Sequence, residues 1–148
     1  MNRVAPSPYG ASMKELRRFA RDVGALAPIH DFVESFLAAG GIDPEFAFDV
    51  DLLIEELFTN MVKYNRGGTE EIEVGLEADG TQLRISVRDF GVESFDVTQA
   101  PPVDPEMPMS QRRRGGLGLH LVRQIADRVD YEYKDGNSTV TVTKRLES

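Results

Sequence analysis

The stretch of the chain best suited to bind a charged ligand is Arg112–Leu119, where three arginines run into the sequence Gly115-Gly116-Leu117-Gly118. The hydrophobic pattern predicts that an amphipathic helix opens at Gly116 and continues to about Arg128. Glycines allow backbone N–H groups to turn toward an anion, a helix start carries partial positive charge, and arginines supply full charges. This stretch therefore predicts a phosphate-binding site, although a glycine pair before a helix is more often an ordinary loop.

A carboxylate and an amide form a second candidate group, on a helix predicted to begin at Asp43-Pro44 and to continue to about Tyr64. The apolar residues of this helix define a buried stripe, made up of Phe46, Val50, Leu53, Ile54, Leu57, Phe58 and Met61. Glu56 and Asn60 lie four residues apart at the edge of the stripe, so the two side chains are adjacent in space. Taken alone, such a pair is usually a solvated helix edge.

A third candidate is Asp89, at the end of a predicted strand. Two strands, Glu71–Ala78 and Gln82–Asp89, flank the hairpin turn Asp79-Gly80. Apolar and polar residues alternate along the second strand, and the alternation places Asp89 on the apolar face. A carboxylate on the buried side of a sheet needs a hydrogen-bonding partner.

The elements that must position these residues form a layered domain. We expect a strand over Met13–Arg21, with a helix as the alternative, and a helix within Asp22–Ala39 that is broken or begins near Pro28 and ends at Gly40-Gly41. Two further strands, Val129–Lys134 and Thr139–Leu146, flank the turn Asp135-Gly136-Asn137. The fold class is an α/β (α+β) two-layer sandwich, with a mostly antiparallel, mixed sheet covered on one face by helices.

The segment Thr98–Gln111 contains four prolines with acidic residues and methionines between them, so it is neither a helix nor a central strand. A loop of this length is usually functional or disordered, and this one leads directly into the arginines. We therefore expect residues 98–114 to act as a lid over the phosphate site.

Composition bounds the remaining possibilities. The chain has 148 residues, 41% of them hydrophobic, and we expect one domain with a flexible segment at residues 1–12. The absence of cysteine excludes disulfides and zinc–thiolate sites, and two histidines, His30 and His120, are too few for a multi-histidine centre, so any metal should be a hard cation held by oxygens. Neither histidine is expected to be catalytic. A net charge of −8 argues against nucleic-acid binding. Because no apolar run has the pattern of a signal peptide or the length of a membrane span, we expect a cytoplasmic protein.

From about Asp43 to Leu146 the chain resembles the GHKL-type ATP-binding domains shared by histidine kinases and the anti-sigma-factor serine kinases of bacteria. Three ordered motifs carry the resemblance. The segment Glu56–Tyr64 looks like the asparagine box of the family, Asp89-Phe90-Gly91 looks like its first glycine box, and Gly115-Gly116-Leu117-Gly118-Leu119 looks like its second. In its small size and in the sequence of its second glycine box, the chain is most similar to the stand-alone anti-sigma serine kinases.

The resemblance implies that the ligands are ATP and Mg²⁺, and it assigns a role to each motif. Asn60 would bind Mg²⁺ through its amide oxygen, Glu56 would act as the catalytic base toward the attacking hydroxyl, and Lys63 would add charge near the phosphates. Asp89 would accept a hydrogen bond from the adenine amino group, and Gly91 would let the backbone approach the base.

The remaining implied contacts lie in the C-terminal third. Backbone N–H groups of Gly115, Gly116, Leu117, Gly118 and Leu119 would bind the phosphates. Arg114 would reach the terminal phosphate, and Thr139 matches a threonine that lies near adenine in the family. The chain departs from the family at Glu93, where the first glycine box often has a second glycine, and at Tyr64, where the asparagine box often has histidine. The Glu93 change is expected to alter the hinge of the lid.

The function that the resemblance implies is an ATP-dependent protein serine/threonine kinase. It would phosphorylate an anti-sigma-factor antagonist, sequester a sigma factor and form a homodimer. The alternative is a nucleotide-gated protein-binding module of the same fold without significant kinase activity, and Glu56 favours the kinase because binding alone requires no base. A detached histidine-kinase catalytic domain is a third alternative, disfavoured because the sequence shows no phosphoacceptor helix bundle.

Overall fold

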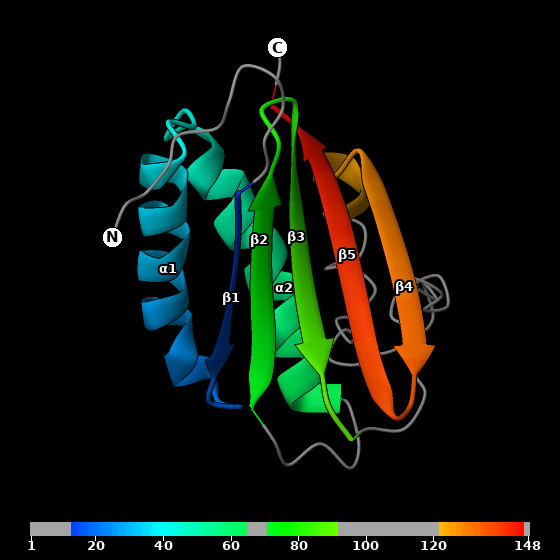
Figure 1. The fold of residues 1–148 in the computed structure, drawn as a ribbon. Helices are drawn as coiled ribbons and strands as arrows, with labels where there is room; N and C mark the ends of the chain where they lie inside the picture. The colour runs from blue at the N-terminus through cyan, green and yellow to red at the C-terminus, as the bar shows by residue number, and fades with distance from the viewer. Residues whose placement is uncertain (1–12, 65–70, 92–121, 147–148) are drawn as a thin grey trace, which may run out of the picture.

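A five-stranded antiparallel sheet is the framework of the computed structural model, which describes residues 13–64, 71–91 and 122–146. The strands are β1 (Met13–Phe19), β2 (Ile72–Ala78), β3 (Gln82–Asp89), β4 (Arg128–Lys134) and β5 (Asn137–Arg145). They lie in the order β1-β2-β3-β5-β4, and each of the four pairings is antiparallel (Figure 1). The expected strand near the N-terminus is thus confirmed as β1. The flexible segment expected at 1–12 and the lid expected at 98–114 lie outside the described residues.

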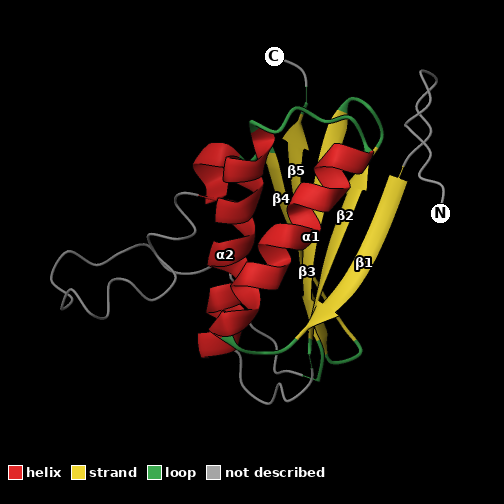
Figure 2. Ribbon diagram, turned by 90° about the vertical axis from the view of Figure 1, so that its left-hand side faces the viewer, coloured by secondary structure: helices red, strands yellow, loops and turns green. Residues whose placement is uncertain are grey.

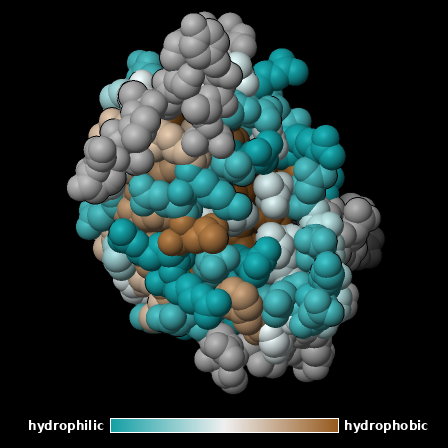
Figure 3. Space-filling model, in the orientation of Figure 1, coloured by the Kyte–Doolittle hydropathy of each residue, from teal (hydrophilic) through white to brown (hydrophobic). Residues whose placement is uncertain are grey.

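Two helices lie against one face of the sheet, as Figure 2 shows, so the expected two-layer architecture is confirmed for the described part of the chain. They are α1 (Leu26–Ala39), preceded by the 3₁₀ turn η1 (Val23–Ala25), and α2 (Phe46–Tyr64). The other face carries mainly hydrophilic side chains (Figure 3), as is usual for an antiparallel sheet with one face in water. None of the described helices is long and apolar enough to cross a membrane.

The helix boundaries agree closely with the sequence signals. Helix α1 begins at Leu26, so Pro28 lies in its first turn, where a missing N–H breaks no helical hydrogen bond. Before α2, Asp43 accepts a hydrogen bond from the N–H of Glu45 (2.9 Å), and the regular helix starts at Phe46. Helix α2 ends at Tyr64, as the glycine pair after it predicted.

The predicted boundaries near the C-terminus were less accurate. Of the helix expected to run to about Arg128, the described part is helical only over 122–125, and Arg128 is already the first residue of β4. Asp127 explains the early end, because its N–H donates to Thr143 O and its carboxylate accepts from the N–H of Arg145 (2.6 Å). Both bonds attach the chain to β5 before the helix can continue.

The turn between β4 and β5 is also shorter than expected. Asp135 and Gly136 both have positive φ angles, 54° and 79°, which is typical of a two-residue hairpin turn. Asn137, predicted as part of the turn, and Ser138 therefore belong to β5, which begins two residues before the predicted Thr139.

The hydrophobic core fills the space between the helices and the sheet. Its largest fully buried side chains include Phe36 of α1, Phe58 of α2 and Ile85 of β3. Along β3 the inward residues alternate strictly with half-buried ones, and the last inward residue is Asp89. The predicted placement of this carboxylate on the apolar face is therefore confirmed.

Candidate functional site

Three ends of the fold meet at one edge of the molecule. Strand β1 ends there, β3 ends there, and α2 reaches the same edge with its last turn, at the lower end of the view in Figure 1. The candidate residues of α2 and of β3 are thus brought to the same end of the two layers. The periodicity of each element had predicted these groups separately, and only the resemblance to the ATP-binding domains had implied that they share one site.

The side chain of Asn60 lies almost completely inside the protein, with 8% of its surface exposed. Its amide nitrogen is buried and has no hydrogen-bond partner among the described residues. A buried polar atom without a partner carries a free-energy penalty, so native structures usually satisfy such atoms with a bound group or water. Asn60 is therefore suited to contact a ligand at this edge.

Glu56 lies one helical turn before Asn60 and is half buried. Burial raises the pKa of the Glu56 carboxyl above its ordinary value, the neighbouring Glu55 carboxylate raises it further, and Lys63 opposes both effects. A carboxylate whose pKa is raised accepts a proton more readily than a solvated one, which is the property that a general base requires. The side chain of Lys63 itself is exposed, in the last turn of α2.

Asp89 is fully buried, and its carboxylate forms an ion pair with Arg21. The predicted need for a partner is thus met by a residue 68 positions away in the sequence, which the sequence analysis did not single out. Arg21 lies just after β1, and its side chain is 15% exposed. A single arginine after a strand is not distinctive, so only the fold could identify it.

The same guanidinium contacts α2. Nη1 of Arg21 donates a hydrogen bond to the carbonyl oxygen of Met61 (3.1 Å), in the last turn of the helix and next to Asn60. Carbonyl groups at a helix C-terminus carry partial negative charge, which favours a cation at this position. Arg21 therefore links the asparagine-containing turn of α2 to the aspartate at the end of β3.

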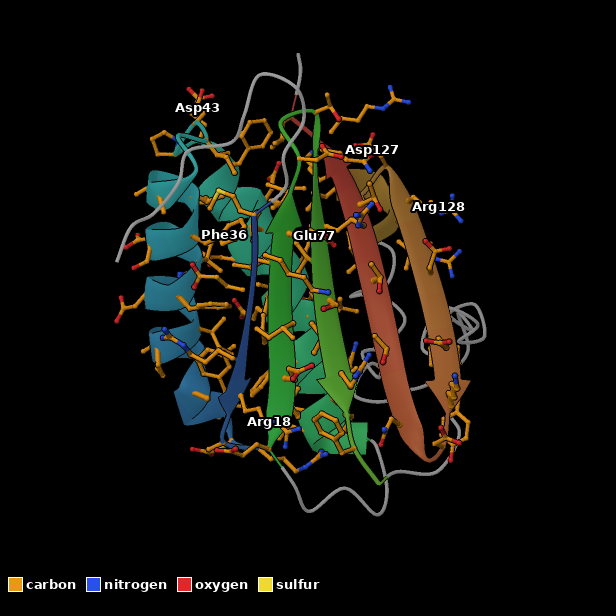
Figure 4. All side chains as sticks on the ribbon, viewed as in Figure 1. Arg18, Phe36, Asp43, Glu77, Asp127 and Arg128 are labelled. Carbon is orange, nitrogen blue, oxygen red and sulfur yellow. The ribbon has the colours of Figure 1, made fainter. Side chains whose placement is uncertain are left out.

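Gly91 takes a backbone conformation that favours glycine, with a φ angle of 61°. Its N–H donates to the side-chain oxygen of Asn137 on β5 (3.3 Å), and no described atom lies within 4 Å of the position that a Cβ would occupy. Between Asp89 and Gly91, the ring of Phe90 is covered by the guanidinium of Arg18, 4.3 Å from the ring centroid. Figure 4 labels Arg18 at this same end of the sheet.

Thr139 does not lie with Asp89. It is opposite Arg88 in the pairing of β3 with β5, and its hydroxyl accepts a hydrogen bond from Arg88 Nε (3.0 Å) on the open face of the sheet. The residue opposite Asp89 is Ser138, which is 2% exposed. The pairing thus places Ser138, and not Thr139, beside Asp89 on the helix-covered face of the sheet.

The other predicted ligand contacts fall in the second glycine box. Arg114, Gly115, Gly116, Leu117, Gly118 and Leu119 lie outside the described residues, as do Glu93 and His120. The described end of the helix that follows is held by β5, since Lys144 donates to the carbonyl oxygen of Ile125 (3.1 Å). Lys144 also lies 3.8 Å from the carboxylate of Asp49 on α2, which joins this helix end to both layers.

Comparison with known proteins gives one matching family and several relatives. The histidine kinase-like ATPase domain matches residues 19–144. Serine-protein kinase RsbW of Halalkalibacterium halodurans is 31% identical over 105 residues, which cover 67% of this chain and 62% of that protein. The anti-sigma F factor of Pasteuria penetrans is 31% identical over 123 residues, covering 78% of this chain and 79% of that protein. The chain thus spans only about three fifths of the length of the first of these relatives.

Two solved structures share the fold. One contains the RsbU and RsbW domains of Rv1364c from Mycobacterium tuberculosis, with a TM-score of 0.62 and 20% identity, covering 90% of this chain and 32% of that one. The other is the SiaB–SiaC complex of Pseudomonas aeruginosa, with a TM-score of 0.52 and 18% identity, covering 89% of each chain. At these identities the likeness concerns the architecture alone.

Proposed function

Because the chain belongs to the histidine kinase-like ATPase family, we propose that it binds ATP with Mg²⁺ and acts as a protein serine/threonine kinase. One observation carries the proposal more than any other. The buried amide nitrogen of Asn60 has no partner among the described residues, and Asn60 lies one helical turn from Glu56. The next residue, Met61, is connected by Arg21 to the buried Asp89. Asn60, Glu56 and Asp89 thus lie at one edge of the fold, and the N–H donors of Asn60, unpartnered in the described part of the chain, suit an acceptor such as a phosphate oxygen.

The proposed contacts with adenine lie at the end of β3. Asp89 accepts a hydrogen bond from the amino group of adenine, and the backbone at Gly91 approaches the ring because no Cβ stands in the way. Ser138 is the hydroxyl residue opposite Asp89 on the same side of the sheet. This assignment replaces the role first expected of Thr139.

The phosphate-binding part rests on α2 and on the second glycine box. Asn60 offers an amide oxygen to Mg²⁺, an ion that keeps few protein ligands and takes the others from phosphates and water. Lys63 adds positive charge near the phosphates, and the N–H groups of Gly115–Leu119 together with Arg114 bind the end of the triphosphate. When bound, Mg²⁺ neutralises charge on the phosphoryl oxygens.

The proposed reaction is an in-line phosphoryl transfer. Glu56 accepts the proton of a serine or threonine hydroxyl while that oxygen bonds to the γ-phosphorus, and the bond from phosphorus to the β,γ-bridging oxygen breaks to release ADP. The raised pKa of Glu56 supports this role, because burial has already made the carboxylate a better proton acceptor.

The protein partners are proposed from the relatives. Proteins named serine-protein kinase and anti-sigma F factor are similar over most of this chain. We propose that the substrate is a small anti-sigma-factor antagonist, that the second partner is a sigma factor, and that the kinase is a homodimer. Light scattering of the purified protein tests the dimer, and co-purification with each candidate partner in ADP and in ATP tests the exchange of partners.

Calorimetry tests nucleotide binding. Wild type should bind ATP only with Mg²⁺ present, and Asn60→Ala should abolish that dependence along with most of the affinity. Absence of binding by folded wild type refutes the proposal.

Phosphate transfer from labelled ATP to the antagonist separates the kinase from a nucleotide-gated binding module, which would bind ATP equally well. Glu56→Gln should reduce transfer at least about a hundredfold, the usual contribution of a general base, whereas Glu34→Gln on the exposed side of α1 should not. Full transfer by Glu56→Gln would exclude Glu56 as the base, and no transfer by wild type would favour the module.

A further inference from the structure

The ion pair between Arg21 and Asp89 has a chemical consequence for the base pocket, the proposed adenine-binding site at the end of β3. Asp89 is fully buried, and an isolated carboxylate in that position would escape the cost of burial by taking up a proton. Arg21 supplies an opposite charge in direct contact with it. The pair therefore favours the ionised form of Asp89 over the protonated one.

The protonation state of Asp89 decides which bases it can recognise. An ionised carboxylate only accepts hydrogen bonds, whereas a protonated one also donates. A 6-amino purine such as adenine presents an N–H donor at position 6, and a 6-oxo purine presents an oxygen acceptor there. An acceptor-only carboxylate pairs with the first and repels the second.

We propose that Arg21 is the specificity-determining residue of the base pocket, because its ion pair with Asp89 holds that carboxylate as a pure acceptor and so selects 6-amino over 6-oxo purine nucleotides. The inference rests on the proposed binding of ATP at Asp89. It gives a function to a residue outside all three sequence motifs, and Arg21 acts through Asp89 without needing to touch the nucleotide.

The surroundings of the pair make Arg21 the relevant charge. On α2 the charged side chains at this edge are Glu56 and Lys63, and Lys63 is exposed at the helix end. On β5 the residue opposite Asp89 is the neutral Ser138. Arg88, the neighbour of Asp89 on β3, points to the open face and bonds to Thr139. Among these described groups, Arg21 is the cation in direct contact with Asp89.

The second contact of Arg21 makes the arrangement rigid. The hydrogen bond from Nη1 to Met61 O fixes the guanidinium against α2 while Nη2 holds the carboxylate. Burial lowers the pKa of Arg21, yet arginine remains charged in proteins because its ordinary value lies far above neutrality. Lysine at this position would keep the charge but lose the forked geometry.

The test compares the dissociation constants of ATP and inosine triphosphate, both with Mg²⁺, at about pH 6.5 and pH 8.5. Wild type should prefer ATP at both pH values. Arg21→Gln should lose at least about tenfold of this preference at the lower pH, the equivalent of one unmatched buried hydrogen bond, and regain part of it at the higher pH as Asp89 ionises. Arg21→Lys should keep the preference. Arg84→Gln, which removes an arginine paired with Glu77 on the open face, is the matched control and should behave as wild type.

A double variant separates this role from a merely structural one. Asp89→Asn removes the titrating group, so adding Arg21→Gln to it should leave the ratio of the two affinities unchanged. A further change in that ratio would overturn the proposal, as would an Arg21→Gln variant that keeps the wild-type preference at both pH values. If Arg21→Gln is too unstable to study, a folded Arg21→Lys that has lost the preference overturns it equally.

Failure of this inference is distinguishable from failure of the proposed function. Wild type that binds neither triphosphate refutes ATP binding. Carbon-13 NMR of the Asp89 carboxyl needs no nucleotide, and Asp89 should take up its proton at a higher pH in Arg21→Gln than in wild type. Equal titration of Asp89 in the two proteins would refute the role of Arg21 even if ATP binds well.

Discussion

Removal of Arg21 should destabilise the fold far more than removal of any surface charge. Asp89 is fully buried and Arg21 is 15% exposed, so Arg21→Met removes a cationic partner from a carboxylate inside the protein. Breaking a buried ion pair from one side costs about 3–5 kcal/mol, to which the lost bond to Met61 O adds about 1 kcal/mol. A domain of this size has a free energy of unfolding of about 5–15 kcal/mol, so the variant should be folded but fragile.

Neutralising Asp89 should cost less stability than removing the charge of Arg21. Asp89→Asn keeps the shape of the side chain and one acceptor oxygen, and the charge that it leaves behind belongs to Arg21, which still reaches solvent. We expect a loss of about 1–3 kcal/mol. The double variant Arg21→Met/Asp89→Asn buries no unpaired charge, so its loss should be smaller than the sum of the two single losses by about 2 kcal/mol.

Urea unfolding followed by circular dichroism measures these quantities, provided that the four proteins show the same dependence of stability on urea. The double-mutant cycle then isolates the interaction between the two side chains. Additivity of the two single losses within about 0.5 kcal/mol would show that the pair contributes no coupling, and the reasoning about a compensated buried charge would be wrong.

Three further predictions concern single positions. Glu56→Gln should increase the free energy of unfolding by up to about 0.5 kcal/mol, because the half-buried carboxylate is destabilised by desolvation and by repulsion from Glu55. The thermal midpoint should rise slightly, and a lower midpoint would contradict this. Gly91→Ala should cost about 1–2 kcal/mol in thermal unfolding because the backbone has a φ angle of 61°, and an unchanged midpoint would show that the segment relaxes. Burial raises the pKa of Asp51, whose carboxylate lies 2.6 Å from His30 Nδ1, so the folded state holds this proton to a higher pH than the unfolded chain does. The contribution of Asp51 to the free energy of unfolding should therefore fall as pH rises from about 3.9, its pKa in the unfolded chain, through its raised pKa in the folded protein. Urea midpoints of wild type should decrease over this pH range, and Asp51→Asn should make the decrease smaller.

Much of the candidate site could be predicted because its signals are local. The helical period brings Glu56 and Asn60 together at the edge of one apolar stripe, and the two-residue period of β3 turns Asp89 inward. Both inferences need only the geometry of one element, and the structure agrees with them. The hairpin around Asp79-Gly80 was predicted on the same grounds.

The errors arose where one element ends against another. The helix expected to reach Arg128 ends earlier because Asp127 bonds to β5, and β5 begins at Asn137 because the turn before it needs only two residues. The register of β3 with β5 places Ser138 opposite Asp89 and Thr139 opposite Arg88 on the other face. Thr139 was expected near adenine from the family resemblance alone, and neighbouring residues of a strand face opposite sides, so only the observed pairing could show that Ser138 lies beside Asp89.

The sequence by itself determined the layers, the inward carboxylate and the amide at the helix edge, because periodicity decides which side of an element a residue occupies. Tertiary structure alone decided that Arg21 neutralises Asp89 and contacts the last turn of α2. Such a contact joins residues 68 positions apart, and it exists only after β1, α2 and β3 have packed with their ends together. No local pattern encodes that distance, since it depends on the register of the sheet and on how the helix lies across it.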